Sequence, residues 1–156
     1  MAKESAGLLM YRKKDGELEF LLVHPGGPFW KKKDAGAWTI PNGEIGVGED
    51  ALAAAKREFE EELGLKPEGS FIGLKPIKQK GGKVVRAWVF EGDCDASQIK
   101  SNTFSMEWPA KSGKMAEFPE VDQAEFFNLE KAKEKINEAQ IPLLEEVGAI
   151  VKMPAG

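Results

Sequence analysis

Residues Gly43 to Leu65 read GEIGVGEDALAAAKREFEEELGL and carry the strongest structural signal of the chain. Its constrained positions are Gly43, Glu49, Arg57, Glu58, Phe59, Glu61, Glu62, Gly64 and Leu65. At ordinary residue usage, a chance match to all of them in a chain of this length has odds below about 10⁻⁶. The residue types, taken together, indicate a metal site.

The middle of this stretch predicts a helix from Asp50 to Leu63. Ala51 to Ala55 are strong helix formers, and Gly64 follows as a stop. One face is apolar, because four apolar side chains recur at helical spacing: Leu52, Ala55, Phe59 and Leu63. Another face is acidic and carries Glu58, Glu61 and Glu62. The helix therefore has a dry face for the core and an acidic face for another purpose.

Carboxylates three and four residues apart destabilise a helix by about a few tenths of a kcal/mol per pair. Positive charge near this face is therefore needed to compensate the repulsion. One interpretation is a solvated face with Arg57 as a partial counterion. The other is a site for a hard divalent cation, which takes oxygen ligands. The register with Gly43, Glu49 and Gly64 favours the cation. Because Mg²⁺ in proteins commonly joins carboxylates to substrate phosphates, the implied ligand is a diphosphate.

The pattern of glycine, glutamate and the run from Arg57 to Leu65 resembles the signature of the Nudix hydrolases without a departure. That family consists of enzymes that hydrolyse nucleoside diphosphates linked to another group. The resemblance implies an α/β (α+β) protein with the Nudix fold, an α/β/α sandwich with a mixed β-sheet. It also implies one domain over residues 1–156.

The resemblance further implies a set of site residues. Candidate catalytic residues are Glu58, Glu61, Glu120 and Arg57. Candidate ligands of Mg²⁺ or Mn²⁺ are Glu58, Glu61, Glu62, Glu120 and the backbone carbonyl of Asn42. Glu49 is expected to brace the loop and the helix start, and Arg57 to orient a glutamate. Which glutamate acts as the general base stays open.

The assignment of Glu120 depends on residues further along the chain. Residues 126–132 read FFNLEKA and resemble the end of related Nudix enzymes. There, a glutamate a few residues before the penultimate strand completes the metal site or acts as the base. Glu120 stands at the expected distance, and Glu117 and Glu125 are the alternatives.

Three segments outside the signature are candidates for substrate binding, the first two with a solvated loop as the alternative. Residues 26–36 hold aromatic side chains and Lys31 to Lys33, which suit a base and phosphates. Residues 78–83 form a turn for which solvent exposure is favoured. Residues 101–122 are too long for a minimal connection, and long ordered loops are often functional. The candidate substrate-binding residues are Trp30, Lys32, Trp108 and Lys114.

Composition narrows the class of protein. The chain has 156 residues and a net charge of −4, which fits a single domain and argues against a stable nucleic-acid complex. No apolar run reaches the roughly 18 residues of a membrane span, and the first residues do not open a secretory signal, so a soluble cytoplasmic protein is expected. Cys94 and His24 are the only residues of their types. His24 is expected in loop packing or a ligand hydrogen bond rather than in catalysis.

A coarse reading of periodicity places six strands and three helices. The strands are expected at residues 6–12, 17–23, 37–40, 71–77, 83–90 and 124–128, and the helices at 50–63, 129–139 and 142–147. The run from Val84 to Phe90 is apolar on both faces, as expected of a central strand covered on each side. Helices on both faces of a mixed sheet are the economical arrangement.

The expected function is a Mg²⁺- or Mn²⁺-dependent pyrophosphohydrolase acting on a nucleotide. The layout resembles a bacterial Nudix subgroup of predicted nucleoside triphosphate pyrophosphohydrolases and, more distantly, the diadenosine tetraphosphate hydrolases. The latter commonly stack adenine on tyrosine, whereas the only tyrosine here, Tyr11, lies in the first expected strand. The leading substrate is a dinucleoside polyphosphate, followed by a nucleoside triphosphate and a sugar nucleotide. The alternatives are a non-catalytic nucleotide sensor and an RNA 5′-end pyrophosphohydrolase. The oligomeric state stays open.

Overall fold

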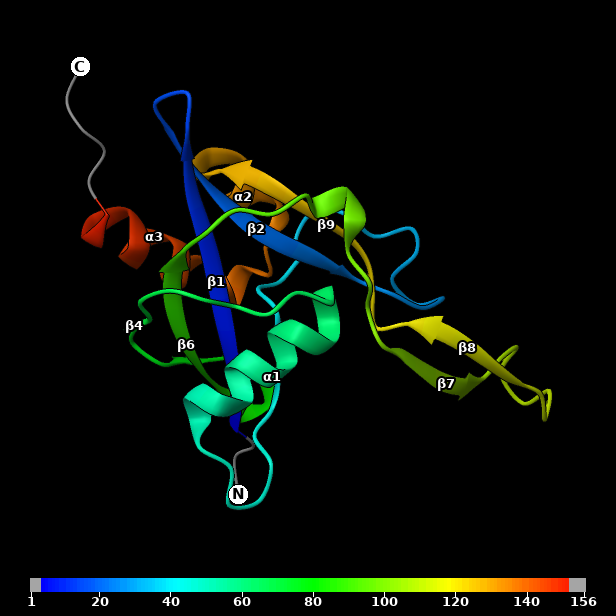
Figure 1. Cartoon of the computed structure of the whole chain (residues 1–156). Coiled ribbons are helices and arrows are strands. Elements are labelled where there is room, and N and C mark those ends of the chain that lie inside the picture. Colours follow the sequence, from blue (N-terminus) through cyan, green and yellow to red (C-terminus); the bar gives the residue numbers. More distant parts are fainter. Residues whose placement is uncertain (1–3, 152–156) are drawn as a thin grey trace.

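The computed structural model describes residues 4–151 (Figure 1). Its strands and α-helices, in chain order, are β1 (Glu4–Lys14), β2 (Glu17–Pro25), β3 (Asn42–Glu44), α1 (Ala51–Leu63), β4 (Ile72–Gly73), β5 (Ile77–Lys78), β6 (Val84–Glu91), β7 (Thr103–Glu107), β8 (Met115–Pro119), β9 (Val121–Asn128), α2 (Leu129–Lys135) and α3 (Ile141–Ile150). Among residues 4–151, no helix combines the length and the apolar character that crossing a membrane requires.

The main sheet is mixed, as the sequence predicts. Its strands run in the order β4-β6-β1-β2-β9, with β3 paired to β1 and β5 paired to β6. β1 and β6 are parallel, from Glu4 opposite Val84 to Tyr11 opposite Glu91. β2 and β9 are antiparallel, which sets Leu22 opposite Glu125. The sheet thereby brings the end of β2 and the start of β9 together.

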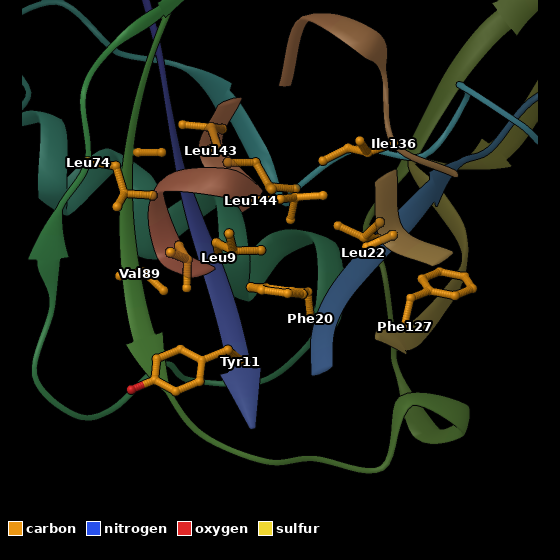
Figure 2. Packing of buried hydrophobic residues seen from close by; sticks show 14 of the residues in the cluster. Leu9, Tyr11, Phe20, Leu22, Leu74, Val89, Phe127, Ile136, Leu143 and Leu144 are labelled. Atoms are coloured by element: carbon orange, nitrogen blue, oxygen red, sulfur yellow. The ribbon is translucent and has the colours of Figure 1, made fainter. Parts of the chain in front are cut away.

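Helices cover both faces of this sheet, so the expected sandwich is confirmed (Figure 1). Successive side chains of a strand point to opposite faces, and β1 is buried on both. Its Leu8 and Met10 pack with Phe59 of α1 in one core. Its Leu9 and Tyr11 belong to the second core, beneath α2 and α3, which Figure 2 shows from close by.

Several element predictions need correction. Residues 37–40 are not a strand, since they make only the isolated bridges Val23 to Thr39 and Trp38 to Ile136. Residues 71–77 are broken into the short β4 and β5, and Pro76, which lacks an N–H for the ladder, lies between them. The second helix ends at Lys135 rather than residue 139, because Asn137 caps a new turn through its bond to the Ala139 N–H.

The segment expected as a long loop, residues 101–122, contains the hairpin β7–β8. Thr103 pairs with Pro119 and Glu107 with Met115, in a two-stranded sheet separate from the main one. Figure 1 shows this hairpin projecting from the body of the protein beyond the ends of β2 and β9. The hairpin therefore stands beside the end of the sheet where the loop after β2 begins.

Candidate active site

Local chemistry fixes both ends of α1, which carries the acidic face. The side chain of Asp50 accepts a hydrogen bond from the Ala53 N–H at 3.1 Å, which caps the first turn. Gly64 ends the helix at a φ of 71°, a left-handed conformation that favours glycine. Phe59 and Leu63 are fully buried beneath it. The predicted helix and its dry face are confirmed, and the acidic side chains are left on the other side.

Arg57 joins the loop before the helix to the acidic face. Its Nε and Nη2 donate to the two carboxylate oxygens of Glu49 at 2.8 and 2.9 Å. Its Nη1 donates to Glu58 at 2.8 Å and to Glu61 at 3.2 Å. Glu49 also accepts from the Gly46 N–H, and the bonds from Arg57 and Gly46 lower the pKa of Glu49 to about 2. Glu49 thus braces the loop, and Arg57 orients two glutamates of the face.

Glu58 lies against the backbone of β3. A Cβ placed on Gly43 would overlap the carboxyl carbon and both carboxyl oxygens of Glu58. Burial raises the pKa of Glu58, and the bond from Arg57 offsets part of that rise. Glycine at position 43 therefore allows a partly buried carboxylate to reach the strand.

Glu62 is the most perturbed acid of the site. Its Oε2 is buried and has no hydrogen-bond partner among residues 4–151. Burial, and then the charges of Glu58 and Glu120, raise the pKa of Glu62 to about 9. A carboxylate with one buried, unpartnered oxygen beside other acids is costly unless a proton or a cation compensates it.

Glu120 approaches the same group of acids from the end of the hairpin. Burial and then the charge of Glu61 raise its pKa. Its backbone is held on two sides, since its N–H donates to the Asn102 carbonyl at 2.8 Å and its carbonyl accepts from the Gly26 N–H at 2.9 Å. The rival Glu117 instead accepts a bond from Thr103 on the hairpin, at 2.6 Å. The rival Glu125 lines a separate cavity beside Arg12.

The remaining predicted ligand, Asn42, lies at the start of β3, opposite Gly7 of β1. Its side-chain amide donates to the Ile40 carbonyl at 2.6 Å. Its backbone N–H faces Glu62 and offsets part of the rise in the pKa of that acid. Asn42 therefore sits beside the acids of α1.

The acidic residues suit a hard divalent cation, although they are not drawn together around one point. Within residues 4–151, no three carboxylate, histidine or cysteine side chains form a ready-made metal site. The oxygen donors of Glu58, Glu61, Glu62 and Glu120 are nevertheless the type that Mg²⁺ and Mn²⁺ prefer. A cation would also supply the partner that the buried Oε2 of Glu62 lacks.

A cavity of about 620 Å³ lies next to Glu120, between the loop after β2 and the hairpin. We call it the aromatic cavity; its lining includes Phe29, Lys31, Lys32, Lys33, Trp108, Phe118, Pro119 and Asp122. Phe29 and Trp108 meet edge to face, with ring centroids 5.7 Å apart. Of the predicted substrate-binding residues, Lys32 and Trp108 line this cavity. Trp30 and Lys114 lie outside the lining, and Trp30 instead has the Lys33 ammonium 5.2 Å from its ring centroid.

Two features of the site have no signal in the sequence. Lys100 and Asn102 line a second cavity of about 500 Å³ beside Arg57 and Glu61, because the chain returns there after β6. His24 pairs with Asp122, which lies 98 residues further along the chain. Only the pairing of β2 with β9 brings these two residues together.

One known protein family matches nearly the whole chain. The NUDIX domain family model matches residues 1–147. A bis(5′-nucleosyl)-tetraphosphatase (asymmetrical) of Caenorhabditis elegans is 40% identical over 68 residues, which cover 44% of this chain and 45% of the relative. The chain thus aligns with slightly less than half the length of this relative.

Solved structures extend the likeness over most of the chain. A binary complex of a C. elegans Ap4A hydrolase superposes with a TM-score of 0.68 at 25% identity, covering 94% of this chain and 96% of that one. The NUDIX domain of Shewanella oneidensis NrtR, complexed with ADP ribose, has the same TM-score of 0.68 at 14% identity, covering 97% and 90%. The second likeness concerns the fold alone. Because the family model covers nearly the whole chain, the protein belongs to the NUDIX domain family.

Proposed function

We propose that this chain is a single NUDIX domain that hydrolyses a diphosphate bond in a nucleoside polyphosphate with the help of Mg²⁺ or Mn²⁺. One observation carries the proposal: the buried, unpartnered carboxylate oxygen of Glu62 beside Glu58 and Glu120. A group so costly to leave alone is typical of a ligand site. The general use of divalent metal ions by Nudix hydrolases supports the same reading.

The residues that would hold the cation are Glu58, Glu61, Glu62 and Glu120, with the Asn42 carbonyl. When bound, the cation supplies positive charge that stabilises the bridging and leaving oxygens of the diphosphate. Arg57 keeps Glu58 and Glu61 in place through its two bonds from Nη1. One carboxylate of this group takes the proton of the attacking water. Glu58, Glu61 and Glu120 are the candidates, and each is partly reached by solvent.

The aromatic cavity is proposed to bind the nucleoside end of the substrate. Phe29 and Trp108 are 64% and 37% exposed, so their rings are available to a base. Lys31, Lys32 and Lys33 line the same cavity and offer charge to phosphates. Pro119 is a lining residue and directly precedes Glu120, which connects the cavity to the acids.

The leading substrate is a dinucleoside polyphosphate such as diadenosine tetraphosphate. The name of the C. elegans relative and the lysines of the aromatic cavity support this choice. A nucleoside triphosphate is the second candidate. A nucleotide sensor is the alternative without catalysis.

One experiment separates these substrates from the sensor. The protein is incubated with Mg²⁺ or Mn²⁺ and a nucleotide panel, and the products are resolved by chromatography. ATP plus AMP from diadenosine tetraphosphate supports the leading substrate, and a nucleoside monophosphate plus pyrophosphate from a triphosphate supports the second. Tight nucleotide binding without turnover of any compound would contradict the enzyme and support the nucleotide sensor.

A further inference from the structure

His24 stands beneath the aromatic cavity and takes no part in the chemistry proposed above. It lies near the end of β2 and is 6% exposed. Its Nε2 lies 2.6 Å from the backbone oxygen of Lys33, and its Nδ1 lies 2.7 Å from Oδ1 of Asp122. The edge of its ring packs on Trp38, at a centroid distance of 5.3 Å. The single histidine of the chain therefore connects the loop after β2 to the start of β9.

These distances define the two groups that the ring ties together. The backbone oxygen of Lys33 and the carboxylate of Asp122 both accept hydrogen bonds, and one ring nitrogen of His24 faces each of them. The ring is almost fully buried between them, so it joins the loop to β9 from below the cavity.

The contact with Asp122 matters because Asp122 belongs to the lining of the aromatic cavity. Its side chain is 35% exposed there, among three lysines. A carboxylate released from its partner at this position would compete for these lysines and repel the phosphates of a nucleotide. The Nδ1 of His24, 2.7 Å from Oδ1 of Asp122, holds this carboxylate in place.

The second contact of the ring fixes the lysines. Residues 31–33 lie in a loop, and the bond to the Lys33 carbonyl is one of the ties that hold it. Further along, Asp34 accepts from the Trp38 indole N–H at 2.8 Å and pairs with Lys135. On the other side of the lysines, the Gly26 N–H donates to the Glu120 carbonyl. His24 is thus placed to set the shape of one wall of the cavity and the position of the Asp122 carboxylate in it.

We propose that His24 is a positioning residue for substrate binding, which holds Lys31 to Lys33 against β9 and keeps the Asp122 carboxylate in a hydrogen bond, so that the aromatic cavity accepts a polyphosphate. This inference rests on the proposed function in one respect, namely that the ligand is a nucleoside polyphosphate. It differs from a role in packing alone because it predicts an effect that depends on the charge of the ligand.

The test compares His24→Ala with the double variant His24→Ala/Asp122→Asn. The steady-state constants are measured with diadenosine tetraphosphate. The dissociation constants are measured by calorimetry for the β,γ-methylene analogue of ATP and for uncharged adenosine. Val147→Ala is the matched control, because Val147 is a fully buried residue of α3 that is placed in no binding role.

For His24→Ala we expect KM and the analogue Kd to rise by about tenfold or more, since charge-assisted hydrogen bonds are lost, while kcat stays within about threefold. The Kd for adenosine should change much less. The double variant should recover about threefold or more of the lost affinity, because it removes the carboxylate left unpaired. Val147→Ala should lower the melting temperature and leave the constants near those of the wild type.

Three results would overturn the proposal: equal losses for the analogue and adenosine, no recovery in the double variant, or the same rise in KM for Val147→Ala. Failure of the proposed function gives a different pattern. In that case the wild type binds the analogue without hydrolysing any substrate, and the two Kd values still decide the role of His24.

Discussion

The carboxylate of Glu58 fills the space that a side chain on Gly43 would need, so the strand β3 and the helix α1 touch through one glycine and one acid. A Cβ at position 43 would overlap the carboxyl carbon and both oxygens of Glu58. The glycine that opens the signature is thereby tied to a candidate metal ligand. Its importance is one of space rather than of backbone conformation.

Gly43→Ala should therefore displace Glu58 and impair the reaction. Loss of a metal ligand's position typically costs about 10–100-fold in metal affinity or activity, and we expect a fall in kcat/KM of this order. Gly73→Ala is the control, because a Cβ there would meet only Trp88 at ordinary contact distances. The measurement is kcat/KM over a Mg²⁺ titration. A Gly43→Ala enzyme with unchanged constants would show that Glu58 need not sit against β3.

Glu61→Gln is expected to lower turnover at least about a hundredfold while the protein stays folded. Glu61 would lose its part in metal binding and its bond from Arg57 would weaken, and the loss of two coupled functions should exceed that of one. Glu145→Gln, which changes an exposed acid on α3, is the matched control. Turnover near the wild-type rate for Glu61→Gln in saturating Mg²⁺ would contradict the metal assignment.

The raised pKa of Glu62 should make the stability of the metal-free protein depend on pH. The pKa of Glu62 is raised from 4.5 to about 9, so between these values the folded protein holds a proton that the unfolded chain has released. Stability should then fall as pH rises through this window, by up to about 1.4 kcal/mol per pH unit. Glu62→Gln removes the titrating group and should flatten that fall.

The measurement is thermal unfolding in EDTA between pH 5.5 and 8.5. The wild type should lose melting temperature toward high pH, whereas Glu62→Gln should lose less and be the more stable protein at pH 8. Added Mg²⁺ should stabilise the wild type at pH 8 and have less effect on the variant, because the metal binds the ionised acid. Parallel pH curves for the two proteins would refute the raised pKa.

Arg57 and Phe59 lie on different faces of α1, and their variants should separate catalysis from stability. Phe59 is fully buried and its ring meets that of Phe90 at 5.5 Å, so Phe59→Ala should destabilise by about 3–5 kcal/mol. Arg57→Ala should instead reduce kcat with a smaller change in melting temperature. Denaturant unfolding and steady-state rates measure the two effects. The reverse pattern would mean that the arginine network is mainly structural.

The aromatic cavity predicts a difference between two tryptophans. Stacking of a base on an aromatic ring is worth about 1–3 kcal/mol, so Trp108→Leu should raise KM for a nucleotide by roughly 5–150-fold. Trp30→Leu should have a smaller effect, because Trp30 lies outside the lining of the cavity. Steady-state kinetics with diadenosine tetraphosphate test both variants. A larger effect of Trp30→Leu than of Trp108→Leu would indicate that the base binds beside Trp30, outside the aromatic cavity.

Local signals in the sequence predict the helix that carries the acids. The ends of α1 follow from Asp50 and Gly64, and its dry face follows from the spacing of Phe59 and Leu63. These signals are local, because a helix closes its hydrogen bonds within four residues and its period repeats along the chain. The family resemblance follows from the same stretch. The mixed sheet is expected from that resemblance and from the order of strands and helices along the chain.

The tertiary structure decided the contacts between distant segments. Glu120 rather than Glu117 or Glu125 approaches the acids of α1, because β8 and β9 direct neighbouring side chains to different places. The pairing of β2 with β9 brings His24 to Asp122, and the fold of the hairpin brings Trp108 to Phe29. Such pairs depend on strand register and on where each loop crosses the surface, which residue periodicity does not encode. The acidic helix is therefore a property of the sequence, whereas the aromatic cavity beside it arises only in the folded chain.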